Sequence, residues 1–183
     1  MSDTKKIVLQ DLLYPIDNQN DEPAESNKIT KRKITTSDNW NFNEYELSQN
    51  KQISYIEQLY NNEVIDNNQC SIITTLFKQK MSGYSSQDKK KSRFSKDEFV
   101  DLEEIIKLLY ECKNQCFYCK KSVDILYENV REPRQWSLER ISNEIGHNKG
   151  NLEIACLHCN VNRKTMNQER FVFTKQLNII KKD

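Results

Sequence analysis

Two Cys-x-x-Cys pairs constrain the fold of this chain more than any other feature of its sequence. The pairs are Cys116 with Cys119 and Cys156 with Cys159, and residues 120–155 lie between them. Each pair turns two thiolates toward one ion, so together they predict a tetrahedral four-cysteine site with structural zinc as its metal. A pair of disulfides would need an oxidising compartment and a thioredoxin-like redox motif would need a βαβ context, and the sequence supports neither.

The two remaining cysteines do not complete a third pair. Cys70 and Cys112 are interpreted as buried free thiols, and Cys112 is the better candidate for a spare ligand because it lies four residues before Cys116. A site with four thiolate ligands is coordinatively closed, so its zinc stabilises the fold and does not catalyse. Any chemistry must therefore come from other residues, and the long segment between the pairs is the place to look.

The charge of the chain is unevenly spread. The 183 residues carry a net charge of +1, which by itself argues against a nucleic-acid partner. However, residues 1–50 hold three more acidic than basic side chains, and residues 51–183 hold four more basic than acidic ones. Basic side chains gather at 78–96 and at 160–183. Such clusters can bind phosphates in a neutral chain, although a solvated face or a flexible loop is the simpler interpretation.

The hydropathy pattern bears on the compartment. No apolar run approaches the roughly 20 residues that span a bilayer. The first residues lead into no apolar stretch of signal-peptide length. We therefore expect an intracellular protein that is not secreted and has no membrane partner.

Composition divides the chain into three parts. Residues 1–50 are polar and acidic, so we expect a weakly structured segment whose two short apolar patches can dock on the folded part or on a protein partner. Residues 51–94 have apolar side chains at helical spacing, which predicts two short helices, followed by a polar, basic loop at 81–91 around Gly83. Residues 95–183 contain both cysteine pairs and form the expected zinc-binding domain.

The third part has the clearest signals for secondary structure. Ser95 and Glu98 form a capping box in front of an apolar stripe, which predicts a helix over residues 96–111. The fold class expected is α+β and mainly helical. The other elements expected are strands at 137–141 and 152–155, helices at 157–164 and 167–180, and a disordered tail.

The segment around the second cysteine pair has an unusual composition. Both histidines of the chain, His147 and His158, and two of its three glycines fall within residues 146–158. The run from Trp136 to Lys164 reads W-S-L-E-R-I-S-N-E-I-G-H-N-K-G-N-L-E-I-A-C-L-H-C-N-V-N-R-K. This run resembles the HNH endonuclease family, in the zinc-stapled Asp-Arg-Ile subset found in phages and large DNA viruses. The resemblance covers about residues 95–175 and is carried by Glu139-Arg140-Ile141, Gly146-His147, Gly150-Asn151-Leu152 and Cys156-Leu157-His158-Cys159-Asn160.

The resemblance implies a ββα-metal finger that nicks or cleaves DNA by phosphodiester hydrolysis. In that fold Glu139 and Asn160 would hold one catalytic Mg²⁺ or Mn²⁺ ion beside the scissile phosphate, while a water attacks. Asn151 would fix the loop between the strands. Arg163 and Lys164 would contact phosphates from the outward face of the helix. The nucleic-acid-binding residues expected are Arg140, Lys149, Arg163 and Lys164.

Three positions depart from the family pattern. Arg140 stands where the family has its general-base histidine, and a guanidinium cannot accept a proton at neutral pH. Glu139 replaces the aspartate of the subset, and Ser142 replaces its second aspartate. His147 is the candidate replacement base, although it can equally pack in the loop. The departures leave a second hypothesis open, namely a catalytically silent module that keeps the zinc fold and binds DNA or a protein partner.

Overall fold

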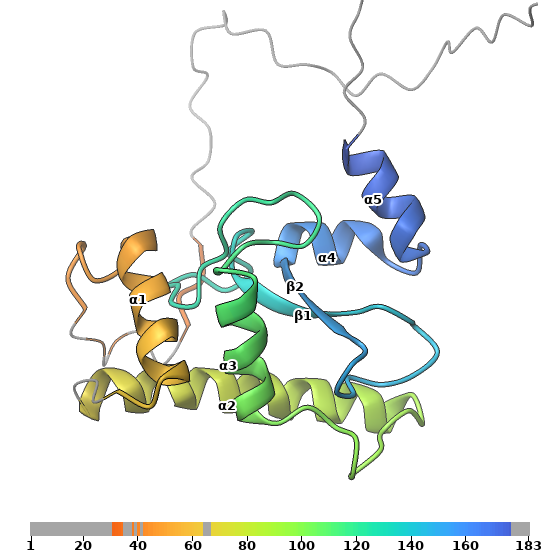
Figure 1. Ribbon diagram of the computed structural model, residues 1–183, viewed down its shortest axis with the longest axis horizontal. Helices are drawn as coiled ribbons and strands as arrows, with labels where there is room; N and C mark the ends of the chain where they lie inside the picture. The colour runs from red at the N-terminus through yellow and green to blue at the C-terminus, as the bar shows by residue number, and fades with distance from the viewer. Residues whose placement is uncertain (1–30, 35–37, 39, 41, 64–66, 177–183) are drawn as a thin grey trace, which may run out of the picture. The chain divides into compact units, whose positions relative to one another are not determined.

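The computed structural model describes residues 31–34, 38, 40, 42–63 and 67–176. Over these residues the chain is a mixed α/β protein with five helices and one two-stranded sheet (Figure 1). The expectations for residues 1–30 and for the tail at 177–183 lie outside the described residues. The elements, in chain order, are α1 (Gln49–Tyr60), α2 (Asn67–Lys90), α3 (Leu102–Glu111), β1 (Trp136–Arg140), β2 (Leu152–Cys156), α4 (Leu157–Arg163) and α5 (Gln168–Gln176).

The two expected strands form an antiparallel hairpin. Its register pairs Leu138 with Ile154 and Glu139 with Glu153, and the strand ends differ from the predicted ones by a single residue. Trp136 and Leu138 are buried, since α2 covers β1: the ring of Phe77 lies 4.8 Å from that of Trp136. Helix α4 follows β2 directly, as expected, and gives the order strand, strand, helix.

Helix α2 contradicts the polar loop predicted around Gly83. The helix runs unbroken through this glycine to Lys90, although its second half is polar. The contacts of the helix with the hairpin explain its length. The hydroxyl of Tyr84 accepts a hydrogen bond of 3.0 Å from the backbone N–H of Leu138, and Asp88 is bonded to His147. Tertiary hydrogen bonds therefore stabilise a helix that the local apolar pattern does not predict.

Helix α3 begins at Leu102, so the capping box predicted at Ser95 is wrong. The N-cap is Asp101, whose carboxylate accepts the N–H of Glu104 at 2.9 Å. The residues before it pair instead with the loop between the strands. The Val100 N–H donates to the His147 carbonyl at 3.0 Å, and the Lys149 N–H donates to the Glu98 carbonyl at 2.8 Å. Before α3 the segment makes a single turn, in which the Phe99 N–H donates to the Ser95 carbonyl at 3.0 Å, and the long-range bonds keep this turn from continuing into the helix.

Helix α1 packs on α3 and fixes the long connection that leads to β1. Its Gln52 is buried, and the side-chain oxygen accepts the N–H groups of Ile125 and Leu126 at 2.8 and 3.0 Å. Tyr60 stacks on Tyr110 with ring centroids 4.0 Å apart.

Among the described residues, no helix has both the length and the apolar character needed to cross a membrane.

Candidate functional site

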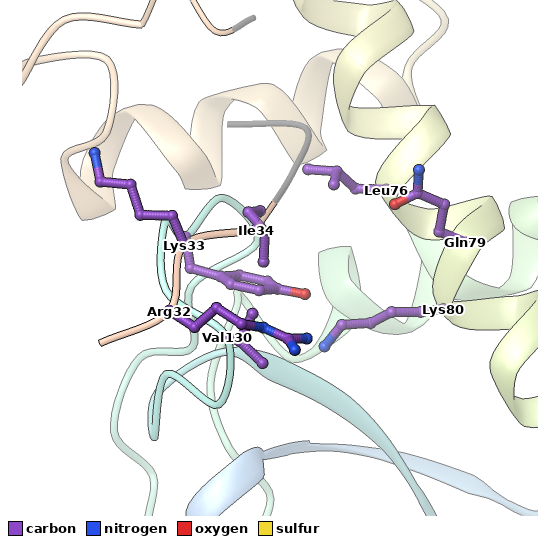
Figure 2. Close-up of a pocket in the computed structure, with 8 residues that line it drawn as sticks. Arg32, Lys33, Ile34, Leu76, Gln79, Lys80 and Val130 are labelled. Atoms are coloured by element: carbon purple, nitrogen blue, oxygen red, sulfur yellow. The ribbon is translucent and has the colours of Figure 1, made fainter. Parts of the chain in front are cut away.

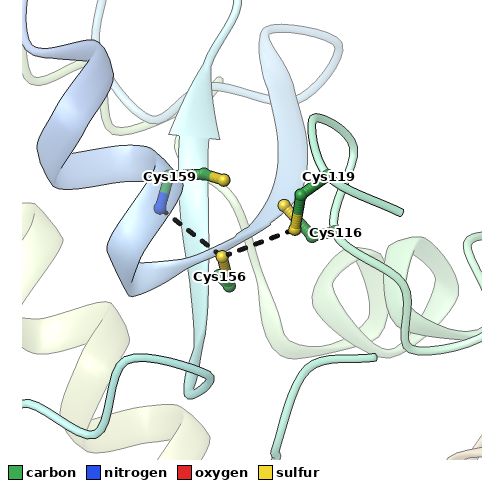
Figure 3. Close-up of side chains that lie close together, drawn as sticks. All are labelled: Cys116, Cys119, Cys156 and Cys159. Carbon is green, nitrogen blue, oxygen red and sulfur yellow. Dashed lines mark hydrogen bonds between the residues drawn. The ribbon is translucent and has the colours of Figure 1, made fainter. Parts of the chain in front are cut away.

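The four cysteines of the two pairs lie together in one cluster (Figure 3). Cys116 and Cys119 belong to the turn that follows α3, while Cys156 ends β2 and Cys159 lies in the first turn of α4. Their sulfur atoms all lie within 4.8 Å of one another, and those of Cys119 and Cys156 are 3.9 Å apart. Zn–S bonds of about 2.3 Å in a tetrahedron place sulfurs about 3.8 Å apart, so the cluster can bind a metal such as zinc.

Backbone bonds position the two pairs. The N–H of Phe117 donates to the carbonyl of Ile154 at 2.7 Å, which ties the first pair to β2. The Cys156 sulfur accepts the N–H of Cys159 at 3.4 Å and so caps α4. A hydrogen bond from the Cys156 thiol lowers the pKa of Cys116. Thiolate is the form that binds metal.

The two spare cysteines lie outside this cluster. Cys112 caps α3, its thiol donates to the Leu109 carbonyl at 3.4 Å, and burial raises its pKa. Cys70 lies on α2 and is half-buried. Both are free thiols, as predicted, but they are half-buried and not buried.

A pocket of about 380 Å³ opens beside β1, α2 and α4, and we call it the β1–α4 pocket. Four of the residues expected in the catalytic site line it. A fifth lining residue, Lys164, was expected to bind nucleic acid. The four are Glu139, Arg140, His147 and Asn160.

Glu139 lies at the buried end of this pocket and is paired with Arg163. One carboxylate oxygen, Oε1, accepts a hydrogen bond from the guanidinium, while Oε2 is buried and has no hydrogen-bond partner among the described residues. Burial raises the pKa of Glu139 to about 7 although Arg163 acts in the opposite direction. The site therefore contains one buried carboxylate oxygen that Arg163 does not bind.

Arg163 does not lie on the outward face of α4, so that expectation is wrong. Its side chain is 1% exposed, because it donates to the carbonyls of Ile141 and Met166 at 3.1 and 2.9 Å besides pairing with Glu139. The guanidinium thus joins the end of β1 to the end of α4. Lys164, the next residue, is exposed.

Asn160 is fixed against β1. Its Nδ2 donates to the Ser137 hydroxyl at 3.1 Å and to the Leu138 carbonyl at 3.0 Å. Both amide hydrogens are thereby used, so the orientation of the side chain is set and Oδ1 is left as an acceptor.

His147 is held by α2, a contact that sequence reasoning missed. Its Nδ1 lies 2.9 and 3.0 Å from the two carboxylate oxygens of Asp88, and its backbone N–H donates to the same group at 2.6 Å. The ring of Tyr84 lies 4.4 Å from the imidazole. Burial lowers the pKa of His147, while Asp88 acts in the opposite direction. The signal in the sequence was Asp88 itself, which is the one acid in the basic run 78–96 and lies one helical turn after Tyr84.

The remaining predicted residues lie around the loop between the strands. Asn151 bridges the loop, since its Oδ1 accepts the N–H of Ser142 at 2.8 Å and its Nδ2 donates to the Gly146 carbonyl at 3.1 Å. This is the loop-fixing role that the resemblance implied. Arg140 donates to the carbonyl of Ile145 at 3.2 Å. Lys149 is exposed and paired with Asp101, away from the β1–α4 pocket.

A second cavity of about 780 Å³ continues from the β1–α4 pocket and shares Arg140, Asn143 and Lys164 with it. We call it the Lys91 cavity. Its basic side chains outnumber its two carboxylates, which are those of Glu144 and Glu169. The basic residues that line it are Lys91, Arg93, Arg140, Arg163 and Lys164.

Comparison with known proteins gives no relative: the chain matches no family model, no curated protein and no solved structure.

Proposed function

We propose that this protein is a metal-dependent endonuclease of the HNH type, which hydrolyses phosphodiester bonds in DNA. One observation carries the proposal, namely that Glu139, Arg140, His147 and Asn160 line a single pocket. The strand–strand–helix order around that pocket and the adjoining four-cysteine cluster support it further. Each side chain then has a role that follows from its surroundings.

The donor atoms in the β1–α4 pocket suit a hard divalent cation. Glu139 offers the buried oxygen Oε2, which has no hydrogen-bond partner in the part of the chain that the structure describes, and Asn160 offers Oδ1. Mg²⁺ characteristically takes one or two protein oxygens and completes its shell with water and substrate phosphate. We infer that these two residues hold Mg²⁺ or Mn²⁺. The ion, when bound, supplies Lewis-acid stabilisation of charge on the phosphate.

His147 is the proton acceptor in this proposal. The Asp88 carboxylate holds Nδ1 in its protonated form, which leaves Nε2 as the basic nitrogen of the neutral imidazole. Burial lowers the pKa of His147, so the ring is neutral at physiological pH and can take a proton from a water. Asp88 and Tyr84 keep the ring in place, so less conformational entropy is lost when the reactive arrangement forms.

Cationic side chains would hold the DNA backbone. Arg140 cannot act as a base, but its guanidinium can bind the phosphate and stabilise negative charge as the bond breaks. Lys164 lines the same pocket, and Lys91 and Arg93 extend the positive surface along the Lys91 cavity. These contacts are independent of base identity, so they would position the strand without specifying its sequence.

The four-cysteine cluster would carry zinc in a structural role. Four thiolates leave no open position on the ion, so the metal would not take part in hydrolysis. It would instead link the turn after α3 to the junction between β2 and α4, where Asn160 follows Cys159.

A plasmid-nicking assay tests the nuclease proposal. Wild-type protein with Mg²⁺ or Mn²⁺ is expected to convert supercoiled plasmid to the nicked form, and the double variant Glu139→Ala with Asn160→Ala is expected to lose this activity. Glu153→Ala is the matched control, because Glu153 faces Glu139 across the hairpin but does not line the pocket. Equal conversion by wild type and double variant would refute the proposal.

One observation favours the alternative, a catalytically silent module that binds DNA. Arg163 already neutralises the carboxylate of Glu139, so a divalent cation would compete with a buried guanidinium for that charge. In this case the plasmid would stay supercoiled with either metal. Binding of a labelled duplex would persist and would weaken steeply with added salt.

A further inference from the structure

A third cavity lies outside the hairpin and α4, and we call it the Arg32 pocket. It has a volume of about 710 Å³ and lies between the short segment 31–34, helix α2 and the connection that leads to β1 (Figure 2). None of its residues has a role in the proposed function, and one of them, Lys80, also lines the β1–α4 pocket.

Backbone pairing builds one side of the Arg32 pocket. The Ile34 N–H donates to the Glu128 carbonyl at 2.8 Å, and the Val130 N–H donates to the Arg32 carbonyl at 2.8 Å. These two bonds flank an antiparallel bridge between Lys33 and Asn129. The segment 31–34 is therefore fixed beside residues 128–130 of the connection that leads to β1. Helix α2 supplies Lys80 from the other side.

The lining of this pocket is positively charged. Within the described part of the chain it contains Arg32, Lys33 and Lys80 and no carboxylate, and the Lys33 ammonium lies 3.7 Å from the carboxylate of Glu128. Among the described residues, Arg32 has no ion-pair partner. Figure 2 shows the guanidinium of Arg32 pointing toward the ammonium of Lys80. Two like charges that converge without an acid between them favour an anion in the space they face.

Lys80 is held in place, but no carboxylate of the described residues is paired with it. Its ammonium donates to Gln135 Oε1 at 3.0 Å and to the Trp136 carbonyl, and it lies 4.7 Å from the centroid of the Trp136 ring. Burial without a carboxylate lowers the pKa of Lys80 to about 7. A bound phosphate would provide the counter-charge that this environment lacks.

The rest of the pocket wall is apolar. Ile34, Leu76 and Val130 contribute aliphatic surface, and Tyr127 contributes an aromatic ring. A bare inorganic anion would leave this surface without a partner. A nucleotide matches the whole lining, because its phosphate suits the cations while its sugar and base suit the apolar and aromatic wall.

We propose that the Arg32 pocket binds one nucleotide of the DNA strand whose neighbouring phosphodiester lies in the β1–α4 pocket. This inference rests on the proposed function, and Lys80 supplies the connection because it lines both pockets. The Lys91 cavity continues from the β1–α4 pocket through Arg140, Asn143 and Lys164. The strand would therefore pass from the Lys91 cavity through the β1–α4 pocket to the Arg32 pocket.

Binding of a fluorescent single-stranded oligonucleotide, with no divalent ion added, tests this inference. Arg32→Gln is expected to weaken binding at least about fivefold and to reduce the slope of log affinity against log salt by about one unit. Lys78→Gln is the matched control, because Lys78 is an exposed cation of α2 that does not line the pocket. Its effect is expected to stay below about twofold. Arg32→Lys retains the charge and is expected to restore most of the affinity.

Equal affinities for Arg32→Gln and Lys78→Gln would overturn the inference. A competition experiment distinguishes a free mononucleotide from a nucleotide within a strand, since both offer the pocket a phosphate, a sugar and a base. If a free mononucleotide displaces the oligonucleotide as well as an unlabelled strand does, the pocket takes free nucleotides and the strand path is wrong. The readout requires no cleavage, so it is distinct from the plasmid assay. A wild type that binds through Arg32 without nicking would support the nucleotide pocket and refute the nuclease.

Discussion

The carboxylate of Asp88 on helix α2 binds both the imidazole and the backbone N–H of His147 in the loop between the strands. The Nδ1 atom lies 2.9 Å from Oδ1, and the backbone N–H donates to Oδ2 at 2.6 Å. The two residues are 59 positions apart in the sequence. This relationship fixes the tautomer of the histidine and gives helix α2 a role in the candidate site that none of its apolar residues indicates.

We expect Asp88→Asn to slow plasmid nicking about 10- to 100-fold with little change in KM, because the amide can hold Nδ1 in the wrong tautomer. The same change removes a charge that raises the pKa of His147. Without that charge, the pKa of His147 should fall, because Arg140 and Lys91 still lower it. The acid limb of the pH–rate profile should therefore move to lower pH. Rates measured between pH 5 and 9 check both effects. Asp97→Asn is the control, because Asp97 is exposed in the same region. An unchanged rate in Asp88→Asn would contradict the role of His147.

Zinc content tests the cysteine cluster. Wild type is expected to carry one zinc ion per chain, measured by native mass spectrometry, and Cys159→Ser is expected to lose it together with several kcal/mol of folding stability. Cys70→Ser serves as the control, because Cys70 lies on α2 outside the cluster. Full zinc occupancy in Cys159→Ser, or equal loss in both variants, would show that the four thiolates do not form the site.

The buried pair of Glu139 and Arg163 predicts a strong effect on stability. Arg163→Ala leaves a buried carboxylate and several carbonyl groups without their donor, so the free energy of unfolding should fall by about 3–5 kcal/mol. Lys164→Ala, at the next and exposed position, should change it by less than about 0.5 kcal/mol. Urea titration followed by circular dichroism measures both. Similar values for the two variants would mean that Arg163 faces solvent.

The contact between α2 and β1 predicts a smaller loss of stability than the one expected for Arg163→Ala. Tyr84→Phe removes the hydroxyl that accepts the N–H of Leu138, so the free energy of unfolding should fall by about 1–3 kcal/mol. Tyr60→Phe is the comparison, since Tyr60 is partly exposed and contacts Tyr110 through its ring. Hydrogen exchange at the Leu138 amide offers a second readout. Unaltered protection in Tyr84→Phe would argue against the bond.

The sequence by itself determined the local parts of this protein. The cysteine spacing, the hairpin at residues 136–156 and the start of α4 at Leu157 are set by neighbouring residues, and the structure has them within a residue of the prediction. The loop-fixing role of Asn151 also depends on residues within ten positions. These features depend on residues that are close in the sequence, so a local motif is enough to predict them.

Tertiary structure decided the features that depend on distant partners. Helix α2 continues past Gly83 because Tyr84 and Asp88 bond to the hairpin, and α3 starts late because the residues before it pair with the loop at His147. Arg163 turns inward because Glu139 and the carbonyls at the end of β1 lie within its reach. A local pattern contains no information about a donor or acceptor that only the fold brings near, and in each case such a partner outweighed the local preference.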